Sequence, residues 1–211
     1  MYADIYVKDR GTLLRMASRS DSKARMITAA RRLFRERGYL GTAFSDVLAE
    51  SGAPRGSVYF HFPGGKEELG TEVAIAHGAD SVAQINRAAA RTATAGELLT
   101  AFLGQARDHL VGTGYREGCA VAPIVVEMTP GSTELSRTVR RGFQDTIGAL
   151  AARLAERGID ADRADSLAAA TMAGLEGALI VSRATQSAAP FDAVITELGR
   201  VADAAAASPS R

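Results

Sequence analysis

Hydrogen-bonding side chains are concentrated in the segment APRGSVYFHFPGGKEEL, which runs from Ala53 to Leu69. Arg55 can donate two hydrogen bonds to the O6 and N7 atoms of a guanine, and Gly56 beside it lets the backbone approach the base edges. The serine, tyrosine and histidine that follow can bond to phosphate oxygens, which fix the register of a protein on the duplex. Lys66 begins the next predicted helix, where its ammonium and the N–H groups of the first turn can share one phosphate. This set of residues indicates contact with double-stranded DNA.

Each of these residues also has an ordinary structural interpretation. Tyr59 can be a packing aromatic, His61 a solvated loop residue and Lys66 a surface lysine. For any one residue the ordinary interpretation is the more common, and only the ordered set within one motif favours DNA binding. The candidate DNA-binding residues are Thr42, Ser45, Arg55, Gly56, Ser57, Tyr59, His61 and Lys66.

Short helices are predicted to position these side chains. The Ser-Asp-Ser sequence at 20–22 can cap a helix, apolar residues then recur at helical spacing, and Gly38 ends it. A second helix is predicted to begin at Thr42, whose side chain is a candidate N-cap, and it breaks at the glycine and proline of SGAP. The third helix covers 55–60. Two short helices joined by a tight, glycine-containing turn predict a helix-turn-helix.

The charge of the chain is uneven along its length. Residues 1–66 contain 12 Lys and Arg against 6 Asp and Glu, whereas residues 67–211 contain 13 against 18, so a net charge of +1 divides into +6 and −5. A basic N-terminal part and an acidic remainder are typical of a protein that meets a polyanion with one end. The alternative is that the arginines are scattered without a function.

Composition limits the class of protein. A hydrophobic content of 46% and a charged content of 23% are those of a soluble globular chain. The N-terminus lacks the apolar core of a signal peptide, and no apolar run approaches the ~20 residues that span a bilayer, so we expect a cytoplasmic protein with no membrane partner. Cys119 is the single cysteine, which excludes an intramolecular disulfide and a cysteine-based zinc site.

The segment RLFRERGYLGTAFSDVLAESGAPRGSVYFHFPGGKEEL resembles the N-terminal DNA-binding region of the TetR family of repressors. The residues that carry the pattern are Phe34, Gly38, Thr42, Gly52, Gly56, Tyr59, Phe62 and Lys66. The stretch through FPGGKEEL, together with GCAVAPIVVEM at 118–128, resembles the LmrA/YxaF type of regulators of multidrug-efflux and flavonoid-responsive genes. Two departures concern the DNA contacts: Ala43 stands where a second Thr or Ser is common, and FPGGK has one residue more than the commonest spacing before Lys66.

The remainder of the chain is predicted to be helical, because no period-2 alternation flanked by hairpin turns is present. We expect an all-α fold with helices at 66–91, 95–112, 119–128, 132–157, 161–186 and 191–206. The predicted division is an N-terminal extension at 1–21, a helix-turn-helix domain at 22–67 and a helical ligand-binding and dimerisation domain at 68–207. For the extension a solvated, disordered tail is favoured over a basic arm in the minor groove.

A pocket for a small apolar or aromatic molecule is predicted between the middle helices. Its candidate ligand-binding residues are Phe102, His109, Tyr115, Cys119, Met128, Phe143, Met172 and Leu175, and His77 is a further candidate that could orient a polar group. Methionine adapts to irregular shapes and suits promiscuous apolar sites. The alternative is that most of these residues are ordinary core. Cys119 lies in an apolar run, where a lone cysteine is usually buried and inert rather than a redox sensor.

Family resemblance implies a homodimer and release from the operator by a small molecule. The helix predicted at 161–186 is apolar on nearly all faces and carries small residues that permit close approach of another helix. With 191–206 it is the expected dimer interface, and the alternative is a core within one chain. No metal-ligand pair, phosphate-binding loop or nucleophile elbow is present, so we expect no enzyme, no cofactor and no metal site. The remaining alternatives are an architectural DNA-binding protein without ligand control and a helical-bundle enzyme.

Overall fold

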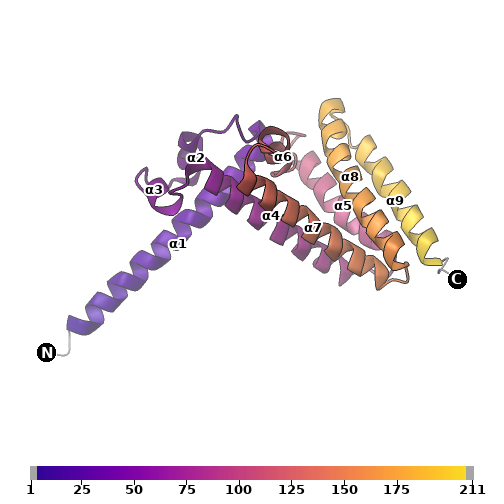
Figure 1. The fold of residues 1–211 in the computed structure, drawn as a ribbon, viewed down its shortest axis with the longest axis horizontal. Coiled ribbons are helices and arrows are strands. Elements are labelled where there is room, and N and C mark those ends of the chain that lie inside the picture. The colour runs from indigo at the N-terminus through magenta and orange to yellow at the C-terminus, as the bar shows by residue number, and fades with distance from the viewer. Residues whose placement is uncertain (1–3, 208–211) are drawn as a thin grey trace.

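The computed structural model describes the backbone of residues 4–207 and the side chains from Asp21 onward. Every regular element within 4–207 is a helix, which confirms the predicted all-α fold (Figure 1). The helices are α1 (Asp4–Arg37), α2 (Phe44–Ser51), α3 (Ser57–His61), α4 (Gly65–Ala89), α5 (Ala95–Gly112), α6 (Ala122–Met128), α7 (Thr133–Ala155), α8 (Ala161–Thr185) and α9 (Ala189–Ala207).

Helix α1 is longer than the sequence predicts. It runs for 34 residues from Asp4, passes through the Ser-Asp-Ser sequence at 20–22 without interruption, and its N-terminal half extends away from the other helices (Figure 1). The predicted start at 20–22 and the predicted disordered tail are therefore wrong for residues 4–21, while residues 1–3 lie outside the described residues. The physical reason is that 4–37 contain no proline, and a capping residue alone does not interrupt a helix. Gly38, with φ of 85°, ends α1 as predicted.

The helix-turn-helix is α2 and α3, but its caps differ from the prediction. The N-cap of α2 is Ala43, whose N–H donates to a carboxylate oxygen of Asp46 at 2.9 Å, and Ala43 has no side-chain acceptor of its own. Thr42 is buried, and its hydroxyl donates to the carbonyl oxygen of Gly38 at 2.8 Å, so its prediction as N-cap is wrong. Helix α3 begins at Ser57 rather than at residue 55.

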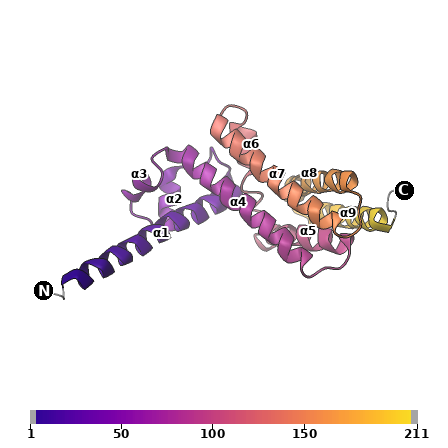
Figure 2. The same ribbon diagram turned by 60° about the horizontal axis from the view of Figure 1, so that its bottom comes forward.

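One apolar core holds the helix-turn-helix. Phe34, Val47, Val58 and Phe62 pack with residues of α4, and the same cluster includes Ile124 of α6 and apolar residues of α7. The predicted domain boundary at 67/68 therefore does not separate two cores. Helices α4 and α7 run side by side between the helix-turn-helix and the distal helices (Figure 2).

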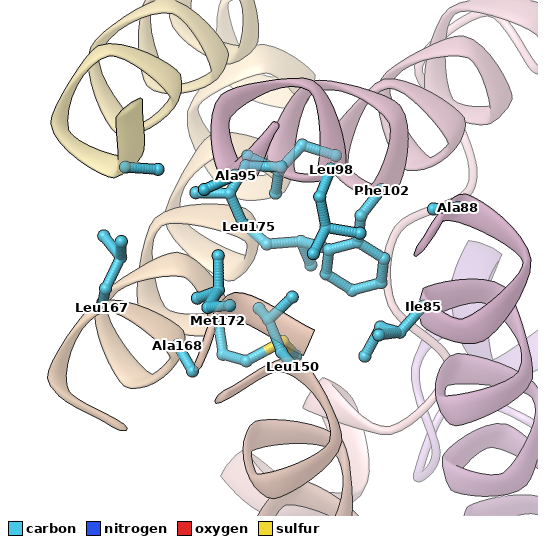
Figure 3. Packing of buried hydrophobic residues seen from close by; sticks show 14 of the residues in the cluster. Ile85, Ala88, Ala95, Leu98, Phe102, Leu150, Leu167, Ala168, Met172 and Leu175 are labelled. Atoms are coloured by element: carbon cyan, nitrogen blue, oxygen red, sulfur yellow. The ribbon is translucent and has the colours of Figure 1, made fainter. Parts of the chain in front are cut away.

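A second core fills the bundle of α4, α5, α7, α8 and α9 (Figure 3). Helices α5 and α9 lie close together at Gly96, where an added Cβ would lie 2.8 Å from the carbonyl oxygen of Gly199. The N–H of Gly96 also donates to Asp203 at 2.7 Å. The predicted boundaries of these helices are right to within about three residues; α9 begins at Ala189 and carries Pro190 in its first turn, where proline is tolerated.

Helix α8 is, among the described helices, the one long and apolar enough to cross a membrane by length and composition. Of its apolar stretch, 44% is buried inside the fold. The core helix of a soluble protein has the same composition. Contacts of α8 with α5, α7 and α9 account for the buried part of this apolar surface.

Candidate functional site

The helix α3 presents its side chains to solvent on one face. Tyr59 is 82% exposed and Phe60 is 60% exposed, while Val58 and Phe62 on the opposite face are buried and anchor the helix. Arg55 is exposed in the turn just before α3. The predicted contacts Arg55 and Tyr59 are therefore accessible to a duplex, from a helix fixed by its own core residues.

Other predicted DNA contacts are less available. The hydroxyl of Ser57 donates to the carbonyl oxygen of Pro54 at 2.6 Å, so its proton is used within the turn. Thr42 is buried and does not reach the surface. Ser45 is exposed at the second position of α2, and His61 is half-buried with its ring against Phe60, 5.0 Å between centroids.

Lys66 lies back against the loop between α1 and α2. Its Nζ is 3.4 Å from the carbonyl oxygen of Leu40 and 4.6 Å from the centroid of the Tyr39 ring. Burial lowers the pKa of Lys66, opposed by the negative charges of Glu127 and Asp46. The extra residue before Lys66 is accommodated by Gly65, which has φ of 69°. Lys66 thus lies at the N-terminus of α4 while contacting the loop that precedes α2.

A cavity of about 550 Å³ lies between α1 and the bundle. Six of the eight predicted ligand-binding residues line it: Phe102, His109, Cys119, Phe143, Met172 and Leu175. His77, the further candidate, lines it as well. Tyr115 lies outside the wall, in the turn after α5 with φ of 60°, and packs on the bundle core. Met128, at the end of α6, packs instead against the core of the helix-turn-helix.

Several charged wall residues were not predicted from the sequence. Arg31 and Arg35 of α1 line the cavity, and so does Glu176 of α8. Arg31 pairs with Asp80 of α4 at 2.6 Å, and Arg35 lies 4.0 Å from Glu117. The sequence does contain one indication that the two arginines act together: they are four positions apart, which places them on the same face of α1.

His77 and Cys119 meet at this wall. The Nε2 atom of His77 lies 3.7 Å from the sulfur of Cys119. Burial, reinforced by the positive charges of Arg35 and Arg31, lowers the pKa of His77 to about 4, so the imidazole is neutral at pH 7. Burial and the charge of Glu176 raise the pKa of the Cys119 thiol to about 12. The thiol stays protonated, as expected of an inert cysteine.

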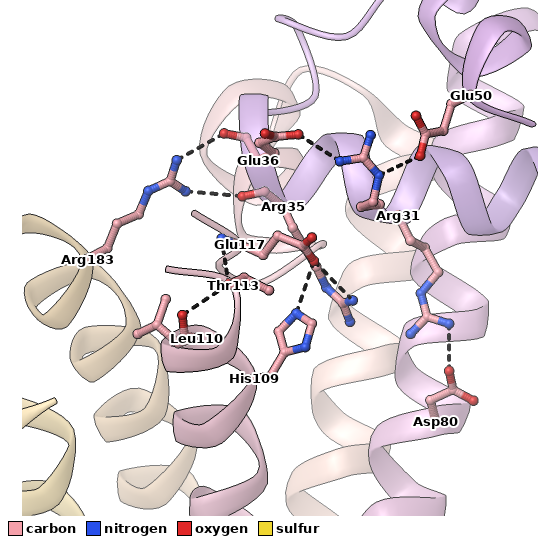
Figure 4. A network of polar contacts seen from close by, with 11 residues as sticks. Arg31, Arg35, Glu36, Glu50, Asp80, His109, Leu110, Thr113, Glu117 and Arg183 are labelled. Atoms are coloured by element: carbon pink, nitrogen blue, oxygen red, sulfur yellow. Dashed lines mark hydrogen bonds and ion pairs between the residues drawn. The ribbon is translucent and has the colours of Figure 1, made fainter. Parts of the chain in front are cut away.

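Polar contacts fasten the C-terminal end of α1 to the bundle (Figure 4). Arg183 of α8 donates to the carbonyl oxygens of Arg35 at 3.1 Å and Glu36 at 3.0 Å, and the N–H of Gly118 donates to the same Arg35 oxygen at 3.2 Å. Next to them, His109 lies 3.0 Å from Glu117. These carbonyl oxygens have no partner within their own helix, so the bundle supplies the C-terminal cap of α1.

Among the described residues, no group of three or more histidine, cysteine or acidic side chains could hold a metal ion. The candidate site consists of the exposed face of α3 and a cavity lined by both polar and apolar residues. The α1 helix borders both.

The chain matches two family models. Bacterial regulatory proteins of the tetR family match residues 26–73, and the C-terminal domain of LmrA/YxaF-like transcriptional regulators matches residues 95–197. An HTH-type transcriptional regulator of Mycobacterium tuberculosis is 36% identical over 181 residues, covering 83% of this chain and 91% of that protein. The HTH-type transcriptional regulator LmrA of Bacillus subtilis is 30% identical over 175 residues, covering 82% and 93%.

Solved structures show the same fold. The regulatory protein TetR from Rhodobacter sphaeroides superposes with a TM-score of 0.74 at 22% identity, over 84% of this chain and 96% of that chain. The chain therefore belongs to the TetR family of DNA-binding transcriptional regulators. Its C-terminal domain is of the LmrA/YxaF-like type, which confirms both resemblances. The relatives are transcriptional regulators, not enzymes, and regulators of this family bind DNA operators and usually dimerise.

Proposed function

We propose that this chain is a repressor that leaves its operator when a small apolar or aromatic molecule enters the cavity. The observation that carries the proposal is the composition of the cavity wall. Arg31 and Arg35 come from α1, which forms the core of the DNA-binding end, and His77 comes from α4, which begins beside the recognition helix. A molecule in the cavity touches both helices.

In this proposal Arg55 reads a base and Lys66 holds a phosphate. Arg55 is exposed immediately before α3, and Tyr59 is the most exposed large side chain of that helix. Ser45, Gly56, Ser57 and His61 are secondary contacts of the same surface. The buried Thr42 supports the loop rather than the duplex.

A homodimer supplies the two reading helices. Apolar residues of α8 remain exposed along one face, at helical spacing: Ala169, Ala173, Gly177, Ile180 and Ala184. Ile180 is 66% exposed, and Val201 of α9 is 37% exposed. An exposed apolar face of this kind is typical of a protein interface, which supports dimerisation through α8 and α9. The protein then acts in the cytoplasm, where its DNA is.

Helix α4 connects the two sites. His77 follows Lys66 by 11 positions, about 16 Å along the helix axis. A ligand that displaces α4 at His77 moves Lys66 as well. Because a dimer of this type reads two half-sites ~34–36 Å apart, a change in the separation of its α3 helices prevents simultaneous docking.

The experiment is a titration of flavonoids and aromatic drugs into the full chain, with and without an operator selected from random duplexes. The ligand should lower operator affinity about 5- to 150-fold, the range for a coupling of ~1–3 kcal/mol, and operator should weaken ligand binding by the same factor. A tight ligand whose affinity is unchanged by DNA would refute the switch. If DNA tightens the ligand, the protein is co-repressed and the direction of the α4 movement is wrong.

A further inference from the structure

The cavity has two chemically different sides. Phe102, Phe143, Met172 and Leu175 form an apolar side within the bundle, three of which are seen together in Figure 3. The lining also includes Arg31, Arg35 and His77, from α1 and α4. A molecule with an apolar body and a polar group would match both kinds of residue.

The polar atoms that lack a partner on this wall are nitrogens. Among the described residues, Nε of Arg31 and Nδ1 of His77 are buried and have no hydrogen-bond partner. Arg35 is held only loosely by charge, with 4.0 Å to Glu117. Buried polar groups are normally satisfied, and each one left unpaired costs about 1–3 kcal/mol. An acceptor oxygen between these side chains would satisfy them together.

The acidic groups of the wall, in contrast, are already engaged. Asp80 pairs with Arg31 at 2.6 Å, and Asp108 pairs with Arg107 at 3.0 Å. Glu176 interacts with the Cys119 thiol, and burial raises the pKa of its carboxyl group. Burial likewise lowers the pKa of Arg35, and an anion beside its guanidinium would offset that cost.

We propose that the effector is an amphipathic organic acid, whose acidic oxygen binds Arg35, Arg31 and His77 and whose apolar body lies against Phe102, Phe143 and Met172. The inference rests on the proposed function, because it defines the molecule that enters the same cavity. The acid contacts α1 directly, on the turn whose carbonyl oxygens are bonded by Arg183 and Gly118. Figure 4 shows the side chains of Arg31 and Arg35 extending from α1 toward the bundle. The acidic group, rather than the body, is then the part of the effector that reaches the DNA-binding end.

Two matched series of probes test the head group separately from the body. The first is 4-phenylbenzoate, 4-phenylbenzyl alcohol and 4-phenylbenzylamine, and the second is decanoate, decanol and decylamine. Affinities for the full chain are measured by calorimetry, since the chain has no tryptophan to report binding. In at least one series the acid should bind about 10- to 100-fold more tightly than the alcohol, as expected for a charge-assisted hydrogen bond.

Substitutions locate that preference. Arg35→Gln should abolish the higher affinity of the acid relative to the alcohol and leave the affinity of the alcohol unchanged. Arg35→Lys should retain part of the acid's higher affinity. The matched control is Arg32→Gln in the same helix, because Arg32 pairs with Glu36 and Glu50 and does not line the cavity. It should behave as the wild type. Circular dichroism confirms that each variant is folded.

The proposal is overturned if the amine is preferred, if neither acid binds, or if the acid's margin survives in Arg35→Gln. Release of operator DNA, measured with the same probes, separates this inference from the proposed function. An acid that binds through Arg35 without weakening operator binding leaves the acid site standing and refutes the switch. Release by the alcohols, with no advantage for the acids, leaves the switch standing and refutes the acid site.

Discussion

Glu127 of α6 accepts a hydrogen bond from the backbone N–H of Leu40 at 2.5 Å, and its other carboxylate oxygen lies 2.7 Å from the position of a Cβ added to Gly38. The loop between α1 and α2 is therefore held by a side chain of α6. Two glycines with positive φ, Gly38 and Gly52, allow the effect of this contact on stability to be measured separately from the effect of the left-handed backbone. At Gly52, with φ of 62°, an added Cβ would have no atom of the described residues within 4 Å.

Gly38→Ala should destabilise the protein more than Gly52→Ala. Both substitutions cost about 1–2 kcal/mol for a left-handed backbone, but only Gly38→Ala also displaces Glu127. Adding Glu127→Ala should remove that excess in the Gly38 background and have no such effect in the Gly52 background. Chemical denaturation measures the free energy of unfolding of the two single variants and the two double variants. Equal costs for the two glycine substitutions would mean that the Glu127 carboxylate yields freely.

Arg183→Gln should loosen the end of α1. The substitution removes hydrogen bonds to two terminal carbonyl oxygens, and each is worth about 0.5–1.5 kcal/mol. We expect a lower melting temperature and faster amide exchange in the last turn of α1. Arg200→Gln is the control, because Arg200 is an exposed arginine that pairs with Glu197 within α9. If the two variants melt alike, the cap contributes nothing measurable.

His77 makes stability depend on pH. Its pKa is about 4 in the folded chain against an ordinary value of 6.5, because of burial and the nearby Arg35 and Arg31. The unfolded chain therefore binds the proton first as the pH falls, so this contribution is complete above pH 6.5 and is lost toward pH 4. His77→Asn should flatten the stability curve in that window, by roughly 3 kcal/mol between the two ends. Denaturation at pH 7.5 and pH 4.5 tests it, and an unchanged difference contradicts it.

Ile180→Glu should convert the proposed dimer to a monomer. The side chain is 66% exposed on α8, so a charge there costs little in the isolated chain and much in an apolar interface. Sedimentation equilibrium gives the mass. Val126→Glu, at an 81% exposed position on α6, should leave the mass unchanged. A dimer that tolerates Ile180→Glu would place the interface elsewhere.

Arg55→Ala and Lys66→Ala should weaken DNA binding in different ways. Loss of a bidentate base contact costs ~1–3 kcal/mol per half-site and relaxes the sequence preference at one position, whereas loss of a phosphate contact weakens all sequences alike and reduces the salt dependence. Because Lys66 also contacts Leu40 and the Tyr39 ring, its substitution should lower thermal stability as well. Binding to selected and random duplexes across salt concentrations measures both. Equal loss of specificity in the two variants contradicts the assignment.

Local patterns predicted most of this fold. The apolar spacing and the glycine and proline breaks located α4 to α9, because those signals act over a few neighbouring residues. The start of α1 was mispredicted because a capping sequence at 20–22 is compatible with a helix interior when no breaker accompanies it. The cap of α2 was mispredicted because the Thr42 hydroxyl donates to the carbonyl oxygen of Gly38 and does not cap an N–H group in the first turn of α2.

The cavity was predicted without its charged residues. Phe102 and Met172 are large apolar residues of central helices, so composition identifies them. From the sequence alone, Arg31 and Arg35 are expected to be solvated residues of a basic helix. They line the cavity only because α1 packs against α4, which lies about 50 positions further along the sequence. Contacts between distant segments of this kind leave no local pattern.

The apolar and the charged residues of the cavity wall differ in how freely they can be substituted. An apolar exchange of similar volume at Phe102 or Met172 alters the shape of the cavity at a cost below about 1.5 kcal/mol. On α1, the turn that carries Arg31 and Arg35 also buries Leu33 and Phe34 in the core of the helix-turn-helix. In the proposed repressor, substitutions at Phe102 or Met172 could therefore change which molecule binds, whereas substitutions in this turn of α1 would also disturb the core that holds the helix-turn-helix. A biosensor derived from this chain is best diversified on the bundle wall, with α1 left intact.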